Sequence, residues 1–331
     1  MSIKIIGTGS YIPEKVLTNQ ELEKMVDTTD EWITSRTGIR ERHIADDGVF
    51  TSDLSVQAAR RALDMAGIAP EQLDLISVAT VTPDTTFPST ACVLQRKIGA
   101  VNAACYDLVA ACTGLIYSLE VAYSLLKASS GKYRYALVLG ADKLSSIVDW
   151  SDRSTCILFG DGASAVVLKN EPDDPAPDFI VASKIGANGN YNDLLKLPAG
   201  GSAMPASHAT VDQRLHYIHM AGKEVFKLAV NGMADSCRNV MQTAGVRPDE
   251  IAWVIPHQAN KRIISAAAQR LDLPLERVYV NIEHIGNTSA ASVGICLDEL
   301  NHSGKLHSGD YILVTAFGGG LTWGAMLIRW N

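Results

Sequence analysis

One stretch decides the fold, YDLVAACTGLIYSLEVAYSLLK from Tyr106 to Lys127, which puts Cys112 at a junction. Residues 103–111 before the junction are short and almost wholly apolar, as expected of a strand buried on both faces. The apolar residues after it recur at helical spacing, Leu115, Leu119, Ala122 and Leu126, with Ile116 and Val121 opposite. We therefore predict a helix that is buried on more than one face.

Cys112 is the candidate nucleophile of the chain. At a helix N-terminus the unpaired amides and the helix dipole favour a thiolate. The small residues Thr113 and Gly114 leave room for a ligand and for close approach of backbone. A free cysteine is also a common small core residue, so the prediction depends on the position and the neighbours of Cys112.

Length and composition limit the possible classes of protein. The chain has 331 residues, so we expect two domains or one duplicated domain. Its net charge of −7 argues against a general nucleic-acid-binding protein. No apolar run approaches the roughly 20 residues that span a bilayer, and no basic and apolar leader follows Met1. We expect neither a membrane protein nor a secreted one.

The cysteines predict the compartment. They show no CxxC spacing and lie mostly in apolar segments, which is typical of free thiols in a reducing cytoplasm. The six are Cys92, Cys105, Cys112, Cys156, Cys237 and Cys296. The sequence has no metal-ligand cluster, no P-loop and no serine elbow, so we expect no metal.

Two ordered internal matches indicate a duplicated unit of alternating strands and helices. Residues 60–79 match residues 237–257 through helix, Ala-Gly, Pro, acidic residue and apolar strand. YALVLGA at 135–141 matches YILVTAF at 311–317. The acidic, proline-rich run 170–179 is the natural linker, so we predict an N-terminal half, 1–170, and a C-terminal half, 171–331.

The duplication brings distant residues into one candidate site. Carrying its register forward places Cys112 opposite Asn287, and His257 ends the predicted strand VIPH. Strand ends and helix starts gather on one side of an alternating sheet, so the three side chains can converge. Alone, each has a plainer interpretation: His257 as a satisfied core histidine, Asn287 as a helix cap, and residues 317–324, FGGGLTWG, as a tight hairpin.

Three other segments carry possible signals. Gly7-Thr8-Gly9 lacks the third glycine of a dinucleotide loop. Trp32, Arg36 and Arg40 recur every four residues, which predicts that they share one face of a helix. This face either binds a nucleotide base and phosphates or is an ordinary solvated helix face. Residues 186–210 have little periodicity, which predicts a mobile lid or a surface excursion.

Seven motifs together resemble those of the β-ketoacyl-acyl-carrier-protein synthase III family, condensing enzymes of the thiolase superfamily. They are TTDEWITSRTGIRER, FPSTAC, ACTG, FGDGA, IPHQAN, GNTSAAS and AFGGGLTWG, and they span nearly the full chain. The resemblance implies an α/β fold, the thiolase-like five-layered αβαβα arrangement of two similar halves, and a homodimer. It also implies a catalytic triad of Cys112, His257 and Asn287.

The resemblance further implies an activity and its residues. An acyl group, most often acetyl or another short chain, passes from acyl-CoA to Cys112, with the amides of Cys112 and Gly319 as the oxyanion hole. Malonyl-acyl-carrier-protein then condenses with it, and no cofactor is needed beyond the CoA thioester substrate. The implied CoA-binding residues are Thr28, Trp32, Arg36, Arg153, Phe226 and Asn260. The implied acyl-pocket residues are Phe87, Leu144, Phe159 and Phe317, with Phe87 entering from the second subunit. The implied carrier-protein docking residues are Lys223, Lys227 and Arg262.

Three alternatives stay open on the sequence. A relative in secondary metabolism would use the same chemistry with another acyl-CoA primer or with malonyl-CoA. A non-catalytic partner subunit would be expected to lose its nucleophile, whereas Cys112, His257 and Asn287 are all present. An oxidoreductase built on the first glycine-rich turn would have to bind a nicotinamide or a flavin.

Overall fold

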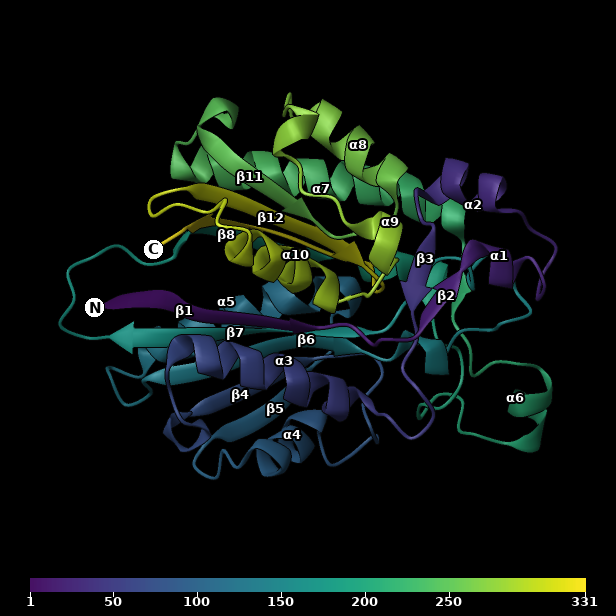
Figure 1. Ribbon diagram of the computed structural model, residues 1–331, viewed down its shortest axis with the longest axis horizontal. Helices are drawn as coiled ribbons and strands as arrows, with labels where there is room; N and C mark the ends of the chain where they lie inside the picture. The colour runs from purple at the N-terminus through teal and green to yellow at the C-terminus, as the bar shows by residue number, and fades with distance from the viewer.

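Helices and sheets alternate in five layers through the molecule. The computed structural model describes residues 1–331. Figure 1 shows the layers from bottom to top: helices, a sheet, central helices, a second sheet and further helices. The helices are α3 (Thr51–Ala66) and α4 (Thr90–Ile98) outside, α5 (Gly114–Ala128) and α10 (Ala291–His302) in the centre, and α7 (Gly222–Ala244) and α8 (Lys261–Arg270) outside. This arrangement confirms the predicted five-layered αβαβα fold.

The strand orders of the two sheets show that the halves are copies of one unit. The first sheet has the order β1 (Ser2–Tyr11), β7 (Gly162–Glu171), β6 (Tyr135–Asp142), β4 (Leu75–Ala79), β5 (Ala104–Leu108). The second has the order β8 (Ile180–Ala187), β13 (Thr322–Arg329), β12 (Tyr311–Gly318), β11 (Ile251–Pro256). Its fifth strand is reduced to one parallel bridge between Val254 and Val278. The predicted duplication is thus visible strand by strand.

The two halves share the central helical layer. β7 ends at Glu171 and β8 begins at Ile180, so the proline-rich run between them joins the sheets, and the exact division at residue 170 stays a prediction. Helix α10 belongs to the second half but packs on β1 and β7 of the first. A Cβ added to Gly140 in β6 would lie 2.3 Å from the carbonyl oxygen of Ala290, so only glycine lets α10 approach.

Helix α5 is buried between the sheets, as its sequence predicted. Leu115, Ile116, Leu119, Ala122 and Leu126 are at most 1% exposed and belong to the largest apolar cluster, which joins both sheets. Burying each leucine or isoleucine side chain stabilises the fold by about 1.5–3 kcal/mol. Because this cluster holds both sheets, it also fixes the end of α5 at which Cys112 lies.

Gly7 and Gly9 lie inside β1 and pack against helix α3. Added Cβ atoms would lie 2.2 Å from the Ala62 oxygen and 2.4 Å from the Ala58 oxygen. The two glycines serve helix–strand packing, so the structure gives no dinucleotide loop there.

The strand before Cys112 differs from the prediction. β5 is the last strand of its sheet, and none of its five residues is buried, since Ala104 is exposed and the others are half-buried. The expectation of a strand buried on both faces is therefore wrong for this chain. Apolar sequence here belongs to a free sheet edge, which offers unpaired backbone groups.

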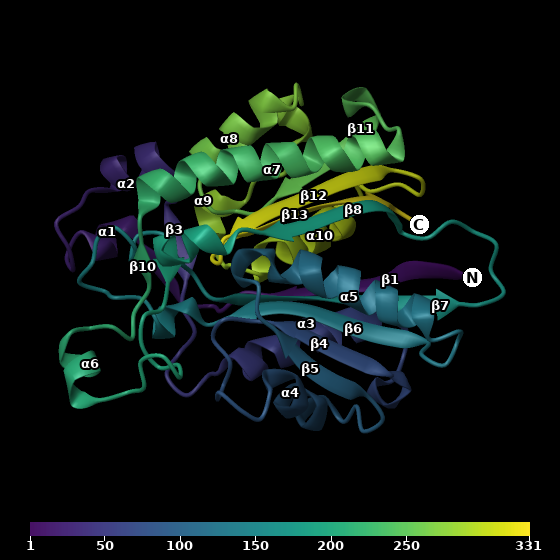
Figure 2. The ribbon, with the colours of Figure 1, turned by 180° about the vertical axis from the view of Figure 1, so that it is seen from behind.

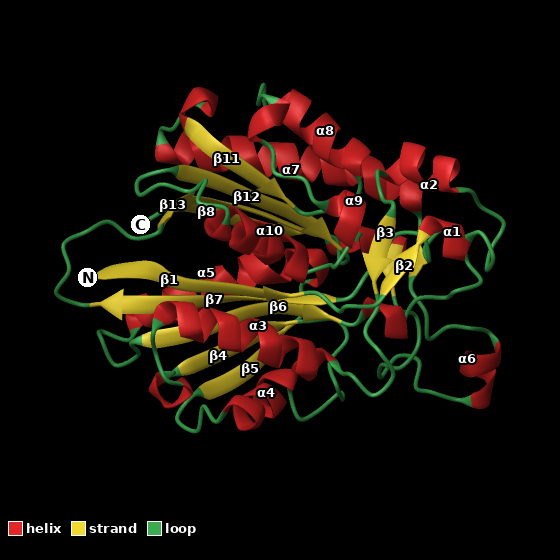
Figure 3. Cartoon of the chain, viewed as in Figure 1, coloured by secondary structure: helices red, strands yellow, loops and turns green.

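Short elements close one end of the molecule, away from both chain termini (Figures 1 and 2). They are α1 (Asn19–Leu22), α2 (Asp30–Thr37), α9 (Ile282–Ile285), β2 (Val16–Thr18) and β3 (Glu41–His43), and β9 (Leu195–Lys196) paired with β10 (His219–Met220). The predicted excursion at 186–210 leaves β8, forms β9 and leads to α6 (His208–Asp212), which projects from the body. Figure 3 shows how much of this end is loop. No helix of the chain is both long enough and apolar enough to cross a membrane.

Candidate active site

Cys112 lies in a single 3-10 turn, Ala111–Thr113, between β5 and α5. Ala111 has φ 47°, a left-handed conformation that costs a non-glycine residue about 1–2 kcal/mol. The hydroxyl of Thr322 donates to the carbonyl of Ala110 at 3.0 Å and lies 2.9 Å from the Thr113 hydroxyl. These bonds tie the turn that carries Cys112 to the hairpin between β12 and β13.

The same hairpin brings a glycine backbone against Cys112. A Cβ on Gly318 would lie 2.7 Å from the Cys112 amide nitrogen, so only glycine fits there. Neither the amide of Cys112 nor that of Gly319 has an acceptor within the chain. Two free amides beside one sulfur are what an oxyanion hole requires.

His257 follows the last residue of β11 and is 1% exposed. Its amide donates to the Thr315 carbonyl at 2.7 Å, and its Nδ1 lies 2.6 Å from Oγ of Ser292 on α10. The Gln258 amide also donates to that Oγ, at 3.4 Å. When the Ser292 hydroxyl donates to Nδ1, the proton of the neutral imidazole is on Nε2. Burial lowers the pKa of His257 to about 3, so the ring is neutral at neutral pH.

Asn287 is fixed by backbone on both sides. Its amide donates to the Leu158 carbonyl at 2.9 Å, and its own carbonyl accepts from the Gly160 amide at 2.9 Å. Its Oδ1 accepts from the Ser289 amide at 2.9 Å. Because an N–H group must face an oxygen, this bond fixes the orientation of the carboxamide and leaves the Nδ2 hydrogens free to donate.

Two cavities meet at Cys112. A cavity of about 220 Å³ is lined by Cys112, His257 and Asn287 together, so the structure brings the three predicted residues into one space. A second cavity of about 480 Å³, mostly apolar, is lined by Cys112, Ser289 and Gly319. Cys112 therefore has one cavity for an incoming thioester and another for an acyl chain.

The ionisation of Cys112 differs from the prediction. Cys112 is half-buried, because it opens into the two cavities. The surrounding protein atoms nevertheless raise the pKa of its thiol to about 12. Desolvation of the charged sulfur is the largest cause of this shift. The nearby Ser289 side chain opposes this shift of the pKa, and the charge of Asp142 adds to it. The direction of this shift is opposite to the one expected from the helix N-terminus, whose effect on the thiol stays a prediction.

Aromatic and cationic side chains gather at the mouth of the smaller cavity. Its walls include Trp32, Arg36, Phe226 and Asn260. The guanidinium carbons of Arg36 and Arg153 lie 4.9 and 5.1 Å from the Trp32 ring centroid. Four of the six predicted CoA-binding residues thus line one cavity, and a fifth packs against it.

Two residues of this region lie elsewhere than expected. Helix α2 ends at Thr37, so Arg40 does not continue the face of Trp32 and Arg36 but pairs with Glu283, Nε to Oε1 at 2.8 Å. Thr28 precedes α2 and does not line the cavity, although its Oγ1 is buried without a hydrogen-bond partner.

The predicted docking cations surround the same mouth. Lys223 and Lys227 are exposed on the first turns of α7, and Arg262 is exposed on the first turn of α8. The guanidinium of Arg262 lies 5.8 Å from the Phe226 ring centroid. Positive charge therefore borders the entrance of a chain whose net charge is −7.

Two of the four residues predicted for the acyl pocket line the larger cavity, and two do not. Leu144 and Phe159 line the larger cavity. Phe317 lines the smaller one instead, and Phe87 is 84% exposed and lines neither. Sequence reasoning missed much of the wall, which comes from β9, from the residues just after β9 and just before β10, and from the loop after β6: Leu195, Leu197, Ile218 and Ile147. The apolar Leu195 and Leu197 in a segment of little periodicity were the only signal.

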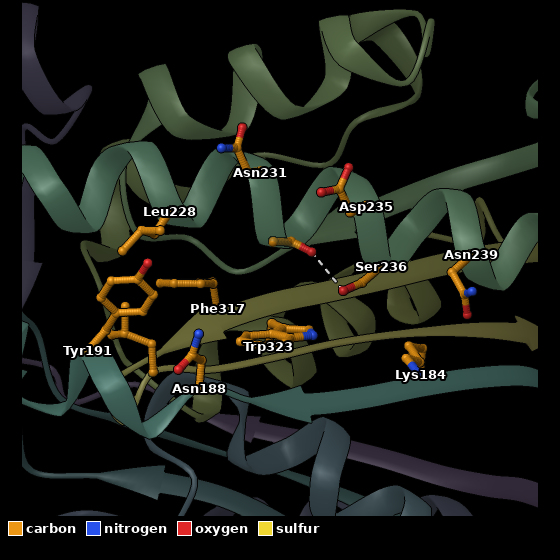
Figure 4. Close-up of a pocket in the computed structure, with 12 residues that line it drawn as sticks. Lys184, Asn188, Tyr191, Leu228, Asn231, Asp235, Ser236, Asn239, Phe317 and Trp323 are labelled. Carbon is orange, nitrogen blue, oxygen red and sulfur yellow. Dashed lines mark hydrogen bonds between the residues drawn. The ribbon is translucent and has the colours of Figure 1, made fainter.

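Phe317 separates the smaller cavity from an outer groove of about 380 Å³. Figure 4 shows the groove between α7 and the sheet, with Trp323 along its floor and Asn231 and Asp235 on the helix above. None of Cys112, His257 and Asn287 lines it.

The chain matches two family models, 3-oxoacyl-[acyl-carrier-protein] synthase III over residues 106–189 and the C-terminal model of the same synthase over residues 241–330. It is 53% identical to a β-ketoacyl-[acyl-carrier-protein] synthase III of Caldanaerobacter subterraneus subsp. tengcongensis, over 99% of this chain and 97% of that one. The chain belongs to the β-ketoacyl-[acyl-carrier-protein] synthase III family. The members of this family are condensing acyltransferases.

Solved structures of synthase III enzymes have the same fold. The enzyme of Aquifex aeolicus superposes with a TM-score of 0.90 at 50% identity, over 99% of this chain and all of that one. A priming β-ketosynthase of the R1128 polyketide pathway also has a TM-score of 0.90, at 33% identity, over 100% of this chain and 96% of that one. No group of three or more His, Cys, Asp and Glu side chains in this synthase III chain is arranged to hold a metal ion.

Proposed function

We propose that this chain starts fatty acid synthesis by condensing an acyl-CoA primer with malonyl-acyl-carrier-protein through an acyl-Cys112 intermediate. The observation that carries the proposal is the position of Cys112 between two cavities, with free donors on His257 and Asn287 facing one of them. The products are a β-ketoacyl-acyl-carrier-protein, carbon dioxide and CoA.

In the first half-reaction the Cys112 sulfur attacks the thioester carbon of acyl-CoA. The negative charge that develops on the carbonyl oxygen is taken up by the free amides of Cys112 and Gly319. Collapse of this intermediate expels the CoA thiolate and leaves the acyl chain in the larger, apolar cavity.

In the second half-reaction the malonyl thioester occupies the smaller cavity. Nε2–H of His257 and Nδ2–H of Asn287 donate to its thioester oxygen, which becomes negative as carbon dioxide leaves. A neutral imidazole suits this role because it keeps its donor proton across the working pH range. The resulting carbanion equivalent attacks the acyl carbon and releases the Cys112 sulfur.

CoA and the carrier protein use one entrance. Trp32 with Arg36 and Arg153 offers an aromatic plane and two cations for adenine and phosphates. Phe226 and Asn260 follow along the tunnel, and the unpartnered Thr28 Oγ1 is a donor for a polar group of the ligand. The acidic carrier protein is attracted to the same mouth by the local positive electrostatic field of Lys223, Lys227 and Arg262.

The working unit in this proposal is a homodimer formed at the free edge of β5. That edge carries an exposed row of backbone groups. Phe87, in the loop between β4 and α4, is 84% exposed, although large apolar side chains are normally buried. Pairing of two β5 edges would give Phe87 a place in the acyl cavity of the partner. All six cysteines are unpaired, which supports the cytoplasm as the compartment.

A primer panel tests the proposal and its substrate range. Acetyl-, isobutyryl-, octanoyl- and benzoyl-CoA would each be tested with malonyl-acyl-carrier-protein and with malonyl-CoA, with release of carbon dioxide and product formation as readouts. We expect turnover with acetyl- or another short acyl-CoA and the carrier-bound malonyl group. Turnover only with malonyl-CoA, or only with benzoyl-CoA, would instead place the chain in secondary metabolism.

A further inference from the structure

Ser292 is a buried serine in direct contact with the imidazole of His257. It lies in the first turn of α10 and is 2% exposed, while His257 is 1% exposed. Its Oγ lies 2.6 Å from Nδ1 of His257. The steps above use only the other ring nitrogen, Nε2, so they give Ser292 no part in the reaction.

Two polar groups lie within hydrogen-bond distance of the Ser292 hydroxyl, and they decide where its hydrogen goes. One is the Gln258 amide at 3.4 Å, and the other is Nδ1 of His257. An amide N–H can only donate, so Gln258 offers no acceptor for the hydroxyl hydrogen. Nδ1 is therefore the one acceptor within the chain to which Ser292 can donate.

The two neutral forms of the His257 ring satisfy this contact unequally. With the ring proton on Nε2, Nδ1 carries a lone pair and accepts the hydroxyl hydrogen of Ser292. With the ring proton on Nδ1, that nitrogen donates to Oγ instead, and the hydroxyl hydrogen stays buried without an acceptor. Because an unmade buried hydrogen bond is costly, the contact favours the form with the proton on Nε2.

No carboxylate competes for the His257 ring. His284, His302 and His307 each pair with a carboxylate, whereas His257 forms no such pair. Burial without an anionic partner also lowers the pKa of His257 to about 3, so the ring carries a single proton. The position of that proton then depends on the partner of Nδ1, which is Ser292.

Gln258 fixes the main chain on one side of this contact. Its side chain is 1% exposed and bonds only to backbone, as a donor to two carbonyls and an acceptor from two amides at 2.8–3.2 Å. The end of β11 that carries His257 is thereby held against α10, which carries Ser292. The four backbone partners of the Gln258 side chain belong to Pro256, Tyr279, Asn281 and Ile282.

We propose that Ser292 is a positioning residue that keeps the proton of His257 on Nε2, where the malonyl thioester oxygen needs a donor. The inference rests on the proposed function, because decarboxylation of the malonyl thioester is the step that uses this donor. The hydroxyl hydrogen stays on Ser292 throughout. With the ring proton on Nδ1 instead, Nε2 would turn a lone pair towards the developing negative charge and oppose the reaction.

The Ser292→Ala variant tests the proposal through carbon dioxide release from malonyl-acyl-carrier-protein and acylation by acetyl-CoA. Decarboxylation should be roughly 10- to 100-fold slower, because part of the protein then carries the proton on Nδ1, and complete loss of a donor costs roughly 10²–10³ in rate. Acylation should stay within about threefold of wild type. Ser292→Thr keeps the hydroxyl and should restore decarboxylation to within about fivefold of wild type.

Ser236→Ala is the matched control. Ser236 is also a buried helical serine, on α7, and its hydroxyl donates to the Gly232 carbonyl at 2.7 Å. The control should behave as wild type in both measurements, because Ser236 lines the outer groove and not the cavity of His257.

Two readouts separate positioning from a structural role. In His257→Gln the carboxamide brings its own N–H donor, so adding Ser292→Ala there should change decarboxylation less than about twofold. Nitrogen-15 NMR of histidine-labelled protein should show His257, assigned by the loss of its signals in His257→Gln, protonated on Nε2. In Ser292→Ala both ring nitrogens should be partly protonated.

Four results would overturn the proposal: wild-type decarboxylation in Ser292→Ala, an equal loss of acylation, the same loss in the His257→Gln background, or NMR signals that leave the proton on Nε2 in Ser292→Ala. If Ser292→Thr does not fold, the alanine variant and the NMR signals decide without it. Failure of the proposed function is distinct, because the wild type itself would then release no carbon dioxide, while the NMR signals still report the position of the proton.

Discussion

Replacing Asn287 with aspartate separates the two half-reactions. The Oδ1 atom that accepts from the Ser289 amide at 2.9 Å is retained, so the local backbone keeps its bond. The Nδ2 donor is replaced by an oxygen that cannot donate when ionised. The amides of Cys112 and Gly319 are untouched. The Asn287→Asp variant should therefore lose one of the two proposed donors to the malonyl thioester oxygen and keep the proposed oxyanion hole for acylation.

The size of the effect follows from that single donor. Removing one preorganised donor to a developing oxyanion costs about 3–4 kcal/mol, which is a factor of roughly 10²–10³ in rate. Decarboxylation of malonyl-acyl-carrier-protein should fall by this factor. Acylation of Cys112 should stay within about threefold of wild type, because no atom of that step is changed.

The assay pairs carbon dioxide release with acyl-enzyme formation, both at pH 8. Asn188→Asp is the control, because Asn188 Oδ1 also accepts from an amide two residues ahead, that of Asn190 at 3.0 Å, but lies in the outer groove (Figure 4). It should behave as wild type in both measurements. Equal loss of acylation and decarboxylation in Asn287→Asp would refute the assigned division of labour.

Three further predictions concern pH, docking and assembly. The pKa of His257 falls from 6.5 to about 3 on folding, so below pH 6.5 the folded state binds fewer protons than the unfolded state and stability is lost as the pH falls towards 3. Between pH 7.5 and pH 4.5 the free energy of unfolding, measured by urea denaturation, should therefore drop by about 3 kcal/mol more in wild type than in His257→Gln. Equal drops in the two proteins would contradict a neutral buried ring. Arg262→Glu should raise the KM for the carrier protein roughly fivefold but leave that for acyl-CoA within about twofold, unlike Arg60→Glu on the outer helix α3; equal effects would remove the docking patch. The amide of Ala104 donates to the carbonyl of Asp74, just before the neighbouring strand β4, so the amide of Cys105, the next residue, points to the free edge of the sheet. Cys105→Pro removes this outward amide and should give a monomer in sedimentation velocity, whereas Cys105→Ala keeps it and should give a dimer. A dimeric Cys105→Pro would place the interface elsewhere.

Periodicity and repetition made much of the fold predictable. The helical spacing of Leu115, Leu119 and Leu126 identified a buried helix because both of its faces are apolar, and the structure places it between the sheets. The internal repeat identified two copies of one unit, which the matching strand orders confirm. It also predicted that His257 and Asn287 meet Cys112, because equivalent strand ends lie on one side of the molecule.

Features that depend on packing between distant segments could not be predicted. The apolar sequence of β5 does not reveal that it is an edge strand, since an edge strand can have the same composition as a buried strand. The four-residue spacing of Arg40 suggested a helical face, but Gly38 at φ 83° ends the helix first. The pKa of Cys112 depends on the atoms packed around it, and the acyl cavity takes Leu195 and Ile218 from elements that meet only in space.

Two serines of the active site belong to a motif that was recognised in the sequence, but their positions in the site could not be predicted from it. Ser289 and Ser292 both stand in GNTSAAS; Ser289 lines the same cavity as Cys112, and Ser292 Oγ lies 2.6 Å from Nδ1 of His257. Ser289 precedes helix α10 and Ser292 lies in its first turn, and the motif alone did not reveal these positions.

The most direct test of the account is the position of the acyl group. The protein would be incubated with ¹⁴C-acetyl-CoA without malonyl substrate, digested and mapped by mass spectrometry. The account predicts one acetyl group per chain, on Cys112, which disappears when malonyl-acyl-carrier-protein is added. Labelling of Cys105, or a label on Cys112 that the malonyl substrate does not remove, would contradict it.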